Sequence, residues 1–123
     1  MMDLPFVGQR IVGHESGYTT AIELSGGFEV RIESRMRLRV RGAEHDVEPG
    51  ADAADGLLDA LAGGEVTLAA ADAEGALRIE LRDGSRVLAL PDPQFEAWTV
   101  AGPGGFKVVC GPGGGLTLWS AAG

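Results

Sequence analysis

A nine-residue pattern that occurs twice constrains the fold of this chain more than any other feature. Ile22-Glu23-Leu24-x-x-Gly27-x-x-Val30 returns as Ile79-Glu80-Leu81-x-x-Gly84-x-x-Val87, 57 residues further on. In each copy, alternating apolar and polar residues flank a glycine, which is typical of two strands joined by a tight turn. The pattern therefore predicts two related β-hairpin units, which we place at residues 7–41 and 64–91.

The first unit keeps one alternation of side chains over residues 18–40. Even positions, from Tyr18 to Val40, are mainly apolar, and the odd positions carry most of the charges. Because side chains alternate between the two faces of a strand, one face should be dry and the other wet. The parity also requires a three-residue turn, Ser25-Gly26-Gly27. One straight strand over residues 28–40 would measure about 40 Å, so we expect a bend near Glu33-Ser34.

The segment between the two units loses this alternation. Residues 42–50 are interpreted as a loop, and residues 52–62 as a helix that Asp52 caps and Gly63 ends. The apolar stripe of this helix is Leu57, Leu58 and Leu61. In the tail, Gly102-Pro103-Gly104-Gly105 recurs as Gly111-Pro112-Gly113-Gly114, with proline and glycine where a type II turn requires them. These turns predict a C-terminal meander over residues 95–120.

Together these observations predict one mainly β domain, residues 1–123. Its two related hairpin and meander units are joined by one short helix and packed as a sandwich or as a rolled, barrel-like sheet. Hydrophobic residues make up 45% of the chain and charged residues 23%, which fits a folded core rather than disorder.

The charge and the cysteine content exclude several classes of protein. A net charge of −8 argues against binding to nucleic acid or to anionic membranes, because both need a basic surface. Residues 1–5 have neither the basic nor the apolar region of a secretory signal. Cys110 is the single cysteine and cannot form an internal disulfide, so a cytoplasmic location is expected.

The second half of the chain carries a more specific block. Pro91-Asp92-Pro93-Gln94-Phe95-Glu96-Ala97-Trp98 is followed by a Gly-Pro-Gly-Gly turn and by Gly113-Gly114-Gly115-Leu116-x-x-Trp119. This half, residues 63–120, resembles a family of small uncharacterised actinobacterial proteins. The family has no established activity, so the resemblance implies no functional residue.

No motif in the sequence predicts a catalytic residue, a metal ligand or a cofactor. The acidic run Glu44-His45-Asp46-x-Glu48 lacks the spacing of a calcium loop. Neither His14 nor His45 has a distinctive partner in the sequence, and no G-x-S-x-G elbow occurs. The glycines at 111–115 precede a strand and are interpreted as a hairpin turn. Cys110 shares parity with Val108 and is predicted to be an inert core thiol.

Arginines at every second position are the sharpest local feature. We call Arg35, Arg37, Arg39 and Arg41 the Arg strip. Residues 31–41 carry five arginines and one glutamate, a local charge of +4, so the remainder of the −8 chain carries −12. The strip is interpreted either as a binding face for an acidic or phosphorylated group or as a solvated face that pairs with acids such as Glu23 and Glu29. Phe95 and Trp98 have opposite parity, and Trp98 is predicted to face outward as a second binding residue.

These features favour a non-enzymatic, cytoplasmic protein-interaction module. Its predicted partner is a protein with an acidic or anionic patch, bound by the Arg strip and Trp98. The alternative is a small-ligand-binding protein or an enzyme with a pocket between the two β units. A packed interior would favour the interaction module, and a concave apolar pocket would favour the alternative.

Overall fold

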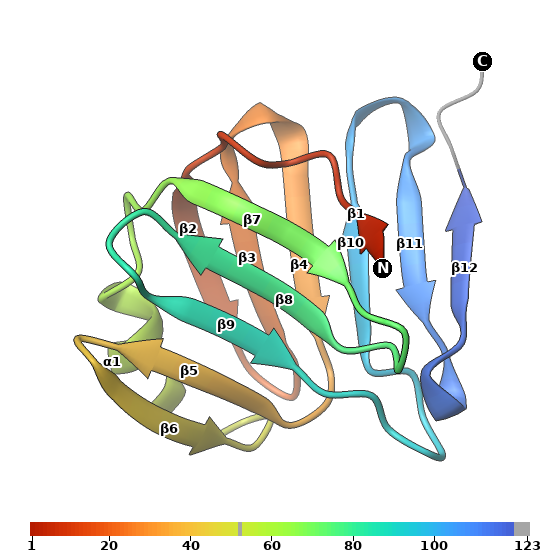
Figure 1. Cartoon of the computed structure of the whole chain (residues 1–123). Coiled ribbons are helices and arrows are strands. Elements are labelled where there is room, and N and C mark those ends of the chain that lie inside the picture. The colour runs from red at the N-terminus through yellow and green to blue at the C-terminus, as the bar shows by residue number, and fades with distance from the viewer. Residues whose placement is uncertain (52, 120–123) are drawn as a thin grey trace.

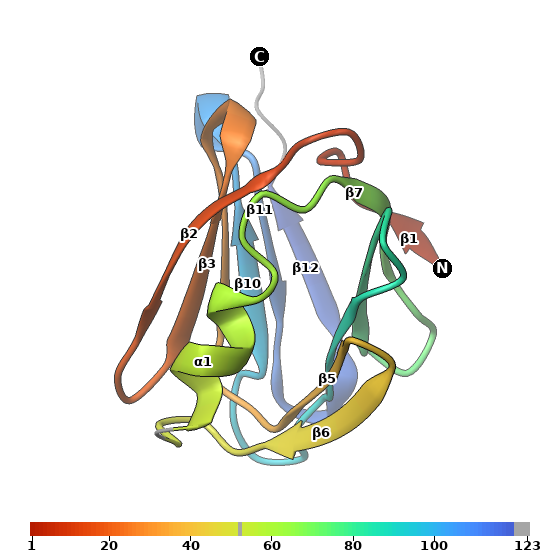
Figure 2. The same cartoon turned by 90° about the vertical axis from the view of Figure 1, so that its left-hand side faces the viewer.

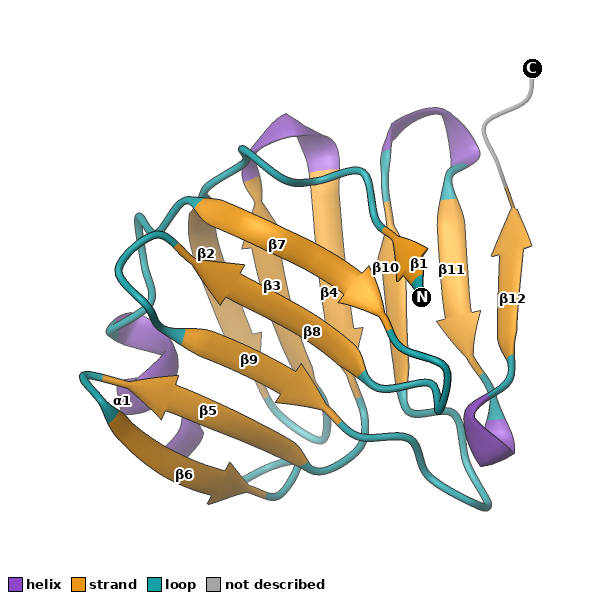
Figure 3. Cartoon of the chain, in the orientation of Figure 1, coloured by secondary structure: helices purple, strands orange, loops and turns teal. Residues whose placement is uncertain are grey.

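The computed structural model describes residues 1–51 and 53–119, which form a two-layer β-sandwich (Figures 1 and 3). The first sheet has the strand order β1-β7-β8-β9-β5-β6, and the second has β12-β11-β10-β4-β3-β2. All strand pairs are antiparallel. The sheets do not close into a barrel, so the sandwich is the packing that occurs.

The strands of the first sheet are β1 (Met2–Asp3), β5 (Met36–Val40), β6 (Ala43–Val47), β7 (Val66–Ala71), β8 (Leu77–Leu81) and β9 (Arg86–Ala89). Those of the second sheet are β2 (Ile11–Ser16), β3 (Thr20–Leu24), β4 (Phe28–Ile32), β10 (Trp98–Ala101), β11 (Lys107–Cys110) and β12 (Leu116–Trp119). Short 3-10 turns at Ser25–Gly27, Pro103–Gly105 and Pro112–Gly114 connect strands of the second sheet.

The chain passes between the two sheets three times. It leaves β1, enters the second sheet at β2, returns to the first sheet between β4 and β5, and crosses again between β9 and β10. The bend expected near Glu33-Ser34 is therefore confirmed, and it is the second of these crossings. The end of β4 and the start of β5 lie in different sheets. Residues 28–40 therefore form two short strands instead of one strand that would be too long for the domain.

Both copies of the repeated pattern form hairpins with the same register. Ile22 pairs with Val30 in the second sheet, and Ile79 pairs with Val87 in the first. The three-residue turn at Ser25–Gly27 is confirmed, because Leu24 pairs with Phe28. The second hairpin also has three loop residues, since the N–H of Leu81 donates to the carbonyl of Ser85 at 2.9 Å. An origin of the two units by internal repetition stays a prediction.

The interpretation of residues 42–50 as a loop is wrong, because Ala43–Val47 form strand β6. β6 lies at the edge of the first sheet and pairs with β5 alone in the part of the chain that the structure describes. Val47 is buried, whereas Glu44 and Asp46 are exposed. An edge strand with one wet face needs few apolar residues, so its sequence resembles a loop.

The helix is shorter than expected. α1 runs over Ala53–Asp59, and the next four residues form a tighter turn with Gly63 at φ +82°. Leu58 and Leu61 are buried and Leu57 partly so, as the apolar stripe predicts. Asp52, the predicted cap, lies outside the described residues. Figure 2 shows α1 between β2 and β6, where it closes one open side of the sandwich.

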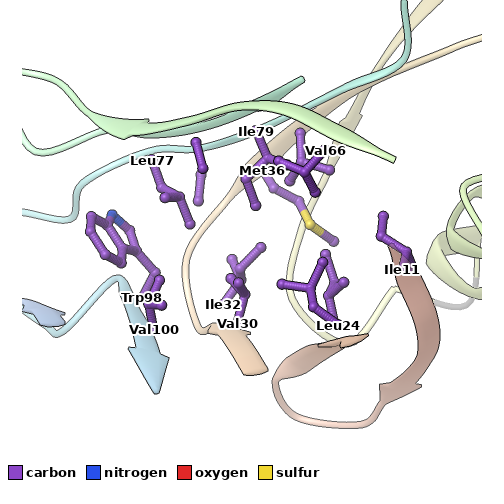
Figure 4. Close-up of a cluster of buried hydrophobic side chains, with 14 of the residues drawn as sticks. Ile11, Leu24, Val30, Ile32, Met36, Val66, Leu77, Ile79, Trp98 and Val100 are labelled. Atoms are coloured by element: carbon purple, nitrogen blue, oxygen red, sulfur yellow. The ribbon is translucent and has the colours of Figure 1, made fainter. Parts of the chain in front are cut away.

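The space between the sheets is packed with apolar side chains from both layers (Figure 4). Ile32, Val30 and Val100 of the second sheet face Met36, Leu77 and Ile79 of the first, and all six are buried. Phe6 and Leu58 add side chains from the N-terminal segment and the helix. No helix within residues 1–51 or 53–119 is long and apolar enough to cross a membrane.

The C-terminal meander is confirmed over β10, β11 and β12, while residue 120 lies outside the described residues. In the second of its two glycine turns, the N–H of Gly114 donates to the carbonyl of Gly111 at 3.0 Å. Gly113 has φ +81° and ψ 1°. With proline before it, this geometry fits a type II turn, which glycine adopts without a steric penalty.

The left-handed backbone of the first hairpin turn generates a prediction. Gly27 has φ +84°, so Gly27→Ala should lower the free energy of unfolding by about 1 to 2 kcal/mol. Gly17 lies outside the left-handed region in open space, so Gly17→Ala should change it by less than about 0.5 kcal/mol. Urea denaturation of both variants measures the difference, and equal stabilities would contradict the role of Gly27.

Candidate functional site

The Arg strip lies beside a matching row of acids on β6. Arg37 pairs in register with Asp46, and Arg39 with Glu44. Nε of Arg37 donates to Oδ1 of Asp46 at 2.9 Å, and Nε of Arg35 donates to Oε1 of Glu48 at 2.9 Å. The acidic run at residues 44–48 is therefore the counter-charge of the strip.

One acid of this row serves two strands. Oε1 of Glu44 lies 3.7 Å from a terminal nitrogen of Arg39 on β5 and accepts a 2.7 Å hydrogen bond from Arg86 on β9. Arg39 and Arg86 are directly opposite each other in the β5–β9 pair. Two arginines placed opposite would repel, and the shared carboxylate reduces this repulsion. Arg86 was not among the predicted site residues, although it continues the cationic row onto the next strand.

The ion pairs offset the positive charge of Arg35, Arg37 and Arg39. The hydrogen bond that Arg37 donates to Asp46, followed by the negative charge of that carboxylate, raises the pKa of Arg37 above its already high ordinary value. Exposed pairs of this kind contribute little to stability, because water and salt screen them. The prediction that the strip pairs with Glu23 and Glu29 is wrong. Both glutamates lie in the second sheet, whereas the strip lies in the first. The geometry is that of a solvated charged face, with acids supplied by β6.

Arg41 does not lie on the strand face with the other three. It occupies the two-residue turn between β5 and β6, with φ +53° beside Gly42 at φ +78°. Arg41, Arg39 and Arg86 line an open depression of about 360 Å³, together with Glu80 and Asp83. Within the described residues, no acid lies at ion-pair distance from Arg41. Arg41, in the turn between β5 and β6, is therefore the member of the strip whose positive charge is not paired in the described part of the chain.

The prediction that Trp98 faces outward is wrong. Its side chain is 0% exposed, and Nε1 donates to the carbonyl of Gly75 at 2.9 Å. β10 begins at Trp98, which pairs with Ile32 and Cys110, both of which face the core. The alternation of side chains could not show whether Phe95 or Trp98 faces outward. It applies only within a strand, and residues 91–97 are not part of one. Trp98 therefore stabilises the sandwich and is not available for binding.

Cys110 lies in the same buried corner. Its Sγ is 3.4 Å from the carbonyl of Gly75, and the residue is fully buried. Burial raises the pKa of the Cys110 thiol, and the nearby charge of Asp72 raises it further. A protonated, inaccessible thiol is a poor nucleophile, so the predicted inert core thiol is confirmed.

A second surface lies at the end of the sandwich where the chain crosses between the sheets. We call it the acidic–aromatic rim; its residues are Tyr18, Thr19, Glu33, Asp92, Phe95 and Glu96, which line an open depression of about 570 Å³. Tyr18 is 98% exposed and Phe95 is 69% exposed. Among residues 1–51 and 53–119, no cation lies at ion-pair distance from Glu33, Asp92 or Glu96. Two exposed rings thus adjoin three carboxylates that form no ion pair within the described residues, and the nearby Arg31 donates to Oγ1 of the rim residue Thr19 at 2.9 Å.

Hydrogen bonds between the two crossings position the rim. Oγ of Ser34 donates to the carbonyl of Leu90 at 2.7 Å, and the N–H of Glu33 donates to the carbonyl of Ala97 at 2.8 Å. The carboxylate of Asp92 accepts the N–H groups of Gln94 and Phe95 at 2.8 and 2.9 Å. These contacts turn the loop so that Phe95 faces solvent while Ala97 and Trp98 enter the core.

Sequence reasoning missed this surface because parity placed Tyr18 on the apolar face. Tyr18 instead lies in the turn between β2 and β3, directly after Gly17. The Ser16-Gly17 and Asp92-Pro93 dipeptides are turn signals, and they could have placed Tyr18 and Phe95 in loops. Nothing in a single sequence shows that these two loops, more than 70 residues apart, meet at one end.

His14 has a partner that the sequence did not show. Its Nε2 lies 2.5 Å from Oδ1 of Asp59 on α1. His14 Nδ1 and Ser16 Oγ are buried and have no hydrogen-bond partner. A depression of about 320 Å³ beside Ser16 extends to Tyr18. In the part of the chain that is described, no three metal-ligating side chains cluster, so this contact joins α1 to β2 without forming a metal centre.

The fold and the surfaces define a class: a small, two-sheet antiparallel β-sandwich with one covering helix and charged ends. Comparison with family models places the chain more narrowly. It belongs to the family of unknown function DUF6188, whose model matches residues 2–120. No curated protein and no solved structure matches the chain. The matched range includes residues 63–120, and the matched family has no known function.

The two tryptophans make a matched pair for a test of the buried corner. Trp98→Phe removes a buried donor and leaves a cavity, so we expect a loss of about 2 to 4 kcal/mol in the free energy of unfolding. Trp119 is 49% exposed, so Trp119→Phe should cost less than about 0.5 kcal/mol. Chemical denaturation at one fixed protein concentration measures both. A larger loss for Trp119→Phe would refute the assignment.

The compensation of the Arg strip can be measured directly. A double-mutant cycle of Arg37→Ala and Asp46→Ala should give a small stabilising coupling at low salt. Because both side chains are exposed, this coupling should shrink towards zero at high salt. Thermal or urea unfolding of the four proteins supplies the values. A coupling that does not change between low and high salt would show a desolvated pair rather than a solvated face.

Proposed function

We propose that this domain is a non-enzymatic protein-interaction module and that the acidic–aromatic rim binds a basic partner protein. The observation that carries the proposal is the pair of exposed rings, Tyr18 and Phe95, beside three carboxylates that form no ion pair in the described part of the chain. Lysine and arginine side chains are attracted both to aromatic faces and to carboxylates. A partner segment that presents such side chains satisfies both parts of the rim at once.

The distribution of charge supports a basic rather than an acidic partner at this end. The chain carries −8 overall, yet the cations on the first sheet are largely paired with acids of that sheet. The excess negative charge is therefore left elsewhere, including at the rim. A surface of one sign steers an oppositely charged partner and raises its association rate, most strongly at low ionic strength.

The packed interior supports an interaction module over the alternative of an enzyme or small-ligand binder. That alternative places a pocket between the two β units. The region between the sheets instead holds the apolar core, with residues such as Met36, Ile79 and Trp98 fully buried. The rim is an open surface at the end of the sandwich, which suits a macromolecular partner better than a small molecule.

An acidic partner at the Arg strip is the second candidate. Arg41 favours it, because its guanidinium lines the 360 Å³ depression without an ion-pair partner in the described part of the chain. Arg39 and Arg86 lie in the same depression, although Glu44 already neutralises part of their charge. The two candidates differ in the charge of the partner, which is acidic for the Arg strip and basic for the rim.

We also propose that the domain works in the cytoplasm and that its source is actinobacterial. A single, buried, free cysteine supports a reducing compartment. The Phe95-Glu96-Ala97-Trp98 block supports the proposed source. The shared register of the two hairpins supports an internal repeat within one domain.

The test compares charge removal at the rim with the same removal elsewhere. Fluorescent lysine-rich, arginine-rich and glutamate-rich peptides serve as probes in anisotropy titrations. Glu33→Gln with Glu96→Gln should weaken binding of the basic peptides about tenfold at low salt. The control, Asp3→Asn with Glu23→Gln, removes the same charge from exposed sites away from the rim and should leave the affinity within about twofold.

Two further variants decide between the candidates. Tyr18→Ala with Phe95→Ala should weaken the basic peptides without any change in charge, because the cation–π contacts are lost. Arg39→Gln with Arg41→Gln should affect the glutamate-rich peptide alone. Equal binding of basic peptides by wild type and both rim variants would refute the rim. Tight glutamate-rich binding that needs Arg41 would move the site to the Arg strip.

A further inference from the structure

The end of the second sheet determines where the parts of the rim lie. β10, β4 and β3 are neighbours in that sheet (Figure 1). Ile32, the last residue of β4, pairs with Thr20, the first residue of β3, and with Trp98, the first residue of β10. These three residues form the last row of strand pairing at this end of the sandwich. The rim lies directly beyond that row.

Glu33 lies between the two loops that carry the exposed rings. It follows the last residue of β4, and its N–H donates to the carbonyl of Ala97, the residue before β10, at 2.8 Å. Tyr18 lies in the turn before β3, whereas Phe95 lies in the loop before β10. Neighbouring strands are about 4.8 Å apart, so β3 and β10, with β4 between them, are about 10 Å apart. The rim therefore has two halves, one with Tyr18 and one with Phe95, on either side of Glu33.

The rim has two glutamates to match its two rings. Within residues 1–51 and 53–119, the carboxylates of Glu33 and Glu96 form neither an ion pair nor a hydrogen bond. Asp92, by contrast, accepts two backbone N–H groups of its own loop. The neighbouring cation Arg31 is paired with Glu29 at 3.2 Å, so its charge is already offset. Two rings and two unengaged carboxylates provide binding groups for two cations.

The size of the hollow also favours more than one side chain. The rim lines a depression of about 570 Å³, within the range of about 300 to 1,000 Å³ that holds a whole drug-sized molecule. A second depression of about 270 Å³ shares Glu33 and Asp92 with it and continues to Pro49 and Pro91. A single lysine or arginine side chain would leave most of this space unfilled. An extended segment of polypeptide fits it better.

On the basis of the function proposed for the rim, we propose that its partner presents two basic residues with one residue between them, and that each half of the rim binds one cation. In an extended segment, side chains at positions i and i+2 point the same way and are about 7 Å apart. The long side chains of basic residues span the remaining distance to the two rings. Arginine fits best, because its planar guanidinium stacks on a ring and donates two N–H groups to a carboxylate.

Two peptides of identical composition test the spacing in anisotropy titrations. The first has eight prolines followed by Arg-Gly-Arg. In the second, the eight prolines separate one arginine from Gly-Arg. Such a spacer is stiff and roughly 25 Å long, so only the first peptide can bind both halves at once. Because the second contact is then intramolecular, the first peptide should bind the wild type at least about tenfold more tightly at low salt.

Removal of one ring at a time tests whether each half binds its own cation. Tyr18→Ala and Phe95→Ala should each lower the affinity for the first peptide to about that for the second. The affinity for the second peptide should change by no more than about threefold, because the other half remains. Trp119 carries a 49% exposed ring outside the rim, so Trp119→Ala should leave both affinities unchanged. Circular dichroism checks that each variant is folded.

The outcomes separate this pairing from the function on which it rests. Equal binding of the two peptides by the wild type would overturn the two-cation site and leave the rim as a binding surface for basic partners. It would also be overturned if Tyr18→Ala or Phe95→Ala weakens both peptides alike, because one cation would then lie between the two rings. If neither peptide binds, both the function of the rim and the two-cation site fail. Weaker binding by Trp119→Ala would place the site outside the rim.

Discussion

The hydrogen bond from the Trp98 indole to the carbonyl of Gly75 fixes how the two sheets sit on each other. Trp98 begins β10 in the second sheet, and Gly75 lies in the turn between β7 and β8 of the first. Asp72 holds that turn by accepting the N–H groups of Glu74 and Ala76. A Cβ on Gly75 would lie 2.5 Å from the carbonyl oxygen of Gly114, so the turns of the two sheets meet backbone to backbone. The glycines of the tail are thus explained partly by packing, beyond their role in turns.

The charges follow from a local rule of antiparallel pairing. Arginine at alternate positions of β5 and acids at alternate positions of β6 face the same way once a two-residue turn joins the strands. The hairpin over residues 35–48 therefore pairs three of its four arginines with its own acids, and Arg41 has no ion-pair partner in the described part of the chain. The rim is built differently, from loops that the chain brings together over long sequence distances, and its carboxylates find no such counter-charge. The regular arginine pattern thus forms a largely ion-paired surface, whereas the carboxylates of the rim come from loops with no regular sequence pattern.

Strand positions could be predicted where one face is buried, because burial imposes a period of two on the sequence. The hairpins around Gly27 and Gly84, the crossing near Ser34 and the C-terminal meander all follow from that period and from glycine turns. β6 was missed because an edge strand buries few residues, so its alternation is polar. Trp98 was misplaced because parity applies only inside a strand, and its strand begins at that residue. The rim could not be predicted from the sequence. Tyr18, Glu33 and Phe95 lie in three different loops that meet only in the folded structure, and such loops have no periodic pattern in the sequence.

The place of the rim on the two crossings has a mechanical consequence. Glu33 lies on the crossing that leads from the second sheet to the first, and Phe95 and Glu96 lie on the crossing that leads back. Ser34 and Leu90 fasten these crossings to each other. A protein seated on the rim would therefore clamp both layers at their shared joint and resist any sliding of one sheet over the other. Its binding energy would add to the cohesion of the whole sandwich, since a ligand of the folded state alone shifts the folding equilibrium by mass action. The domain would be most rigid while it is engaged.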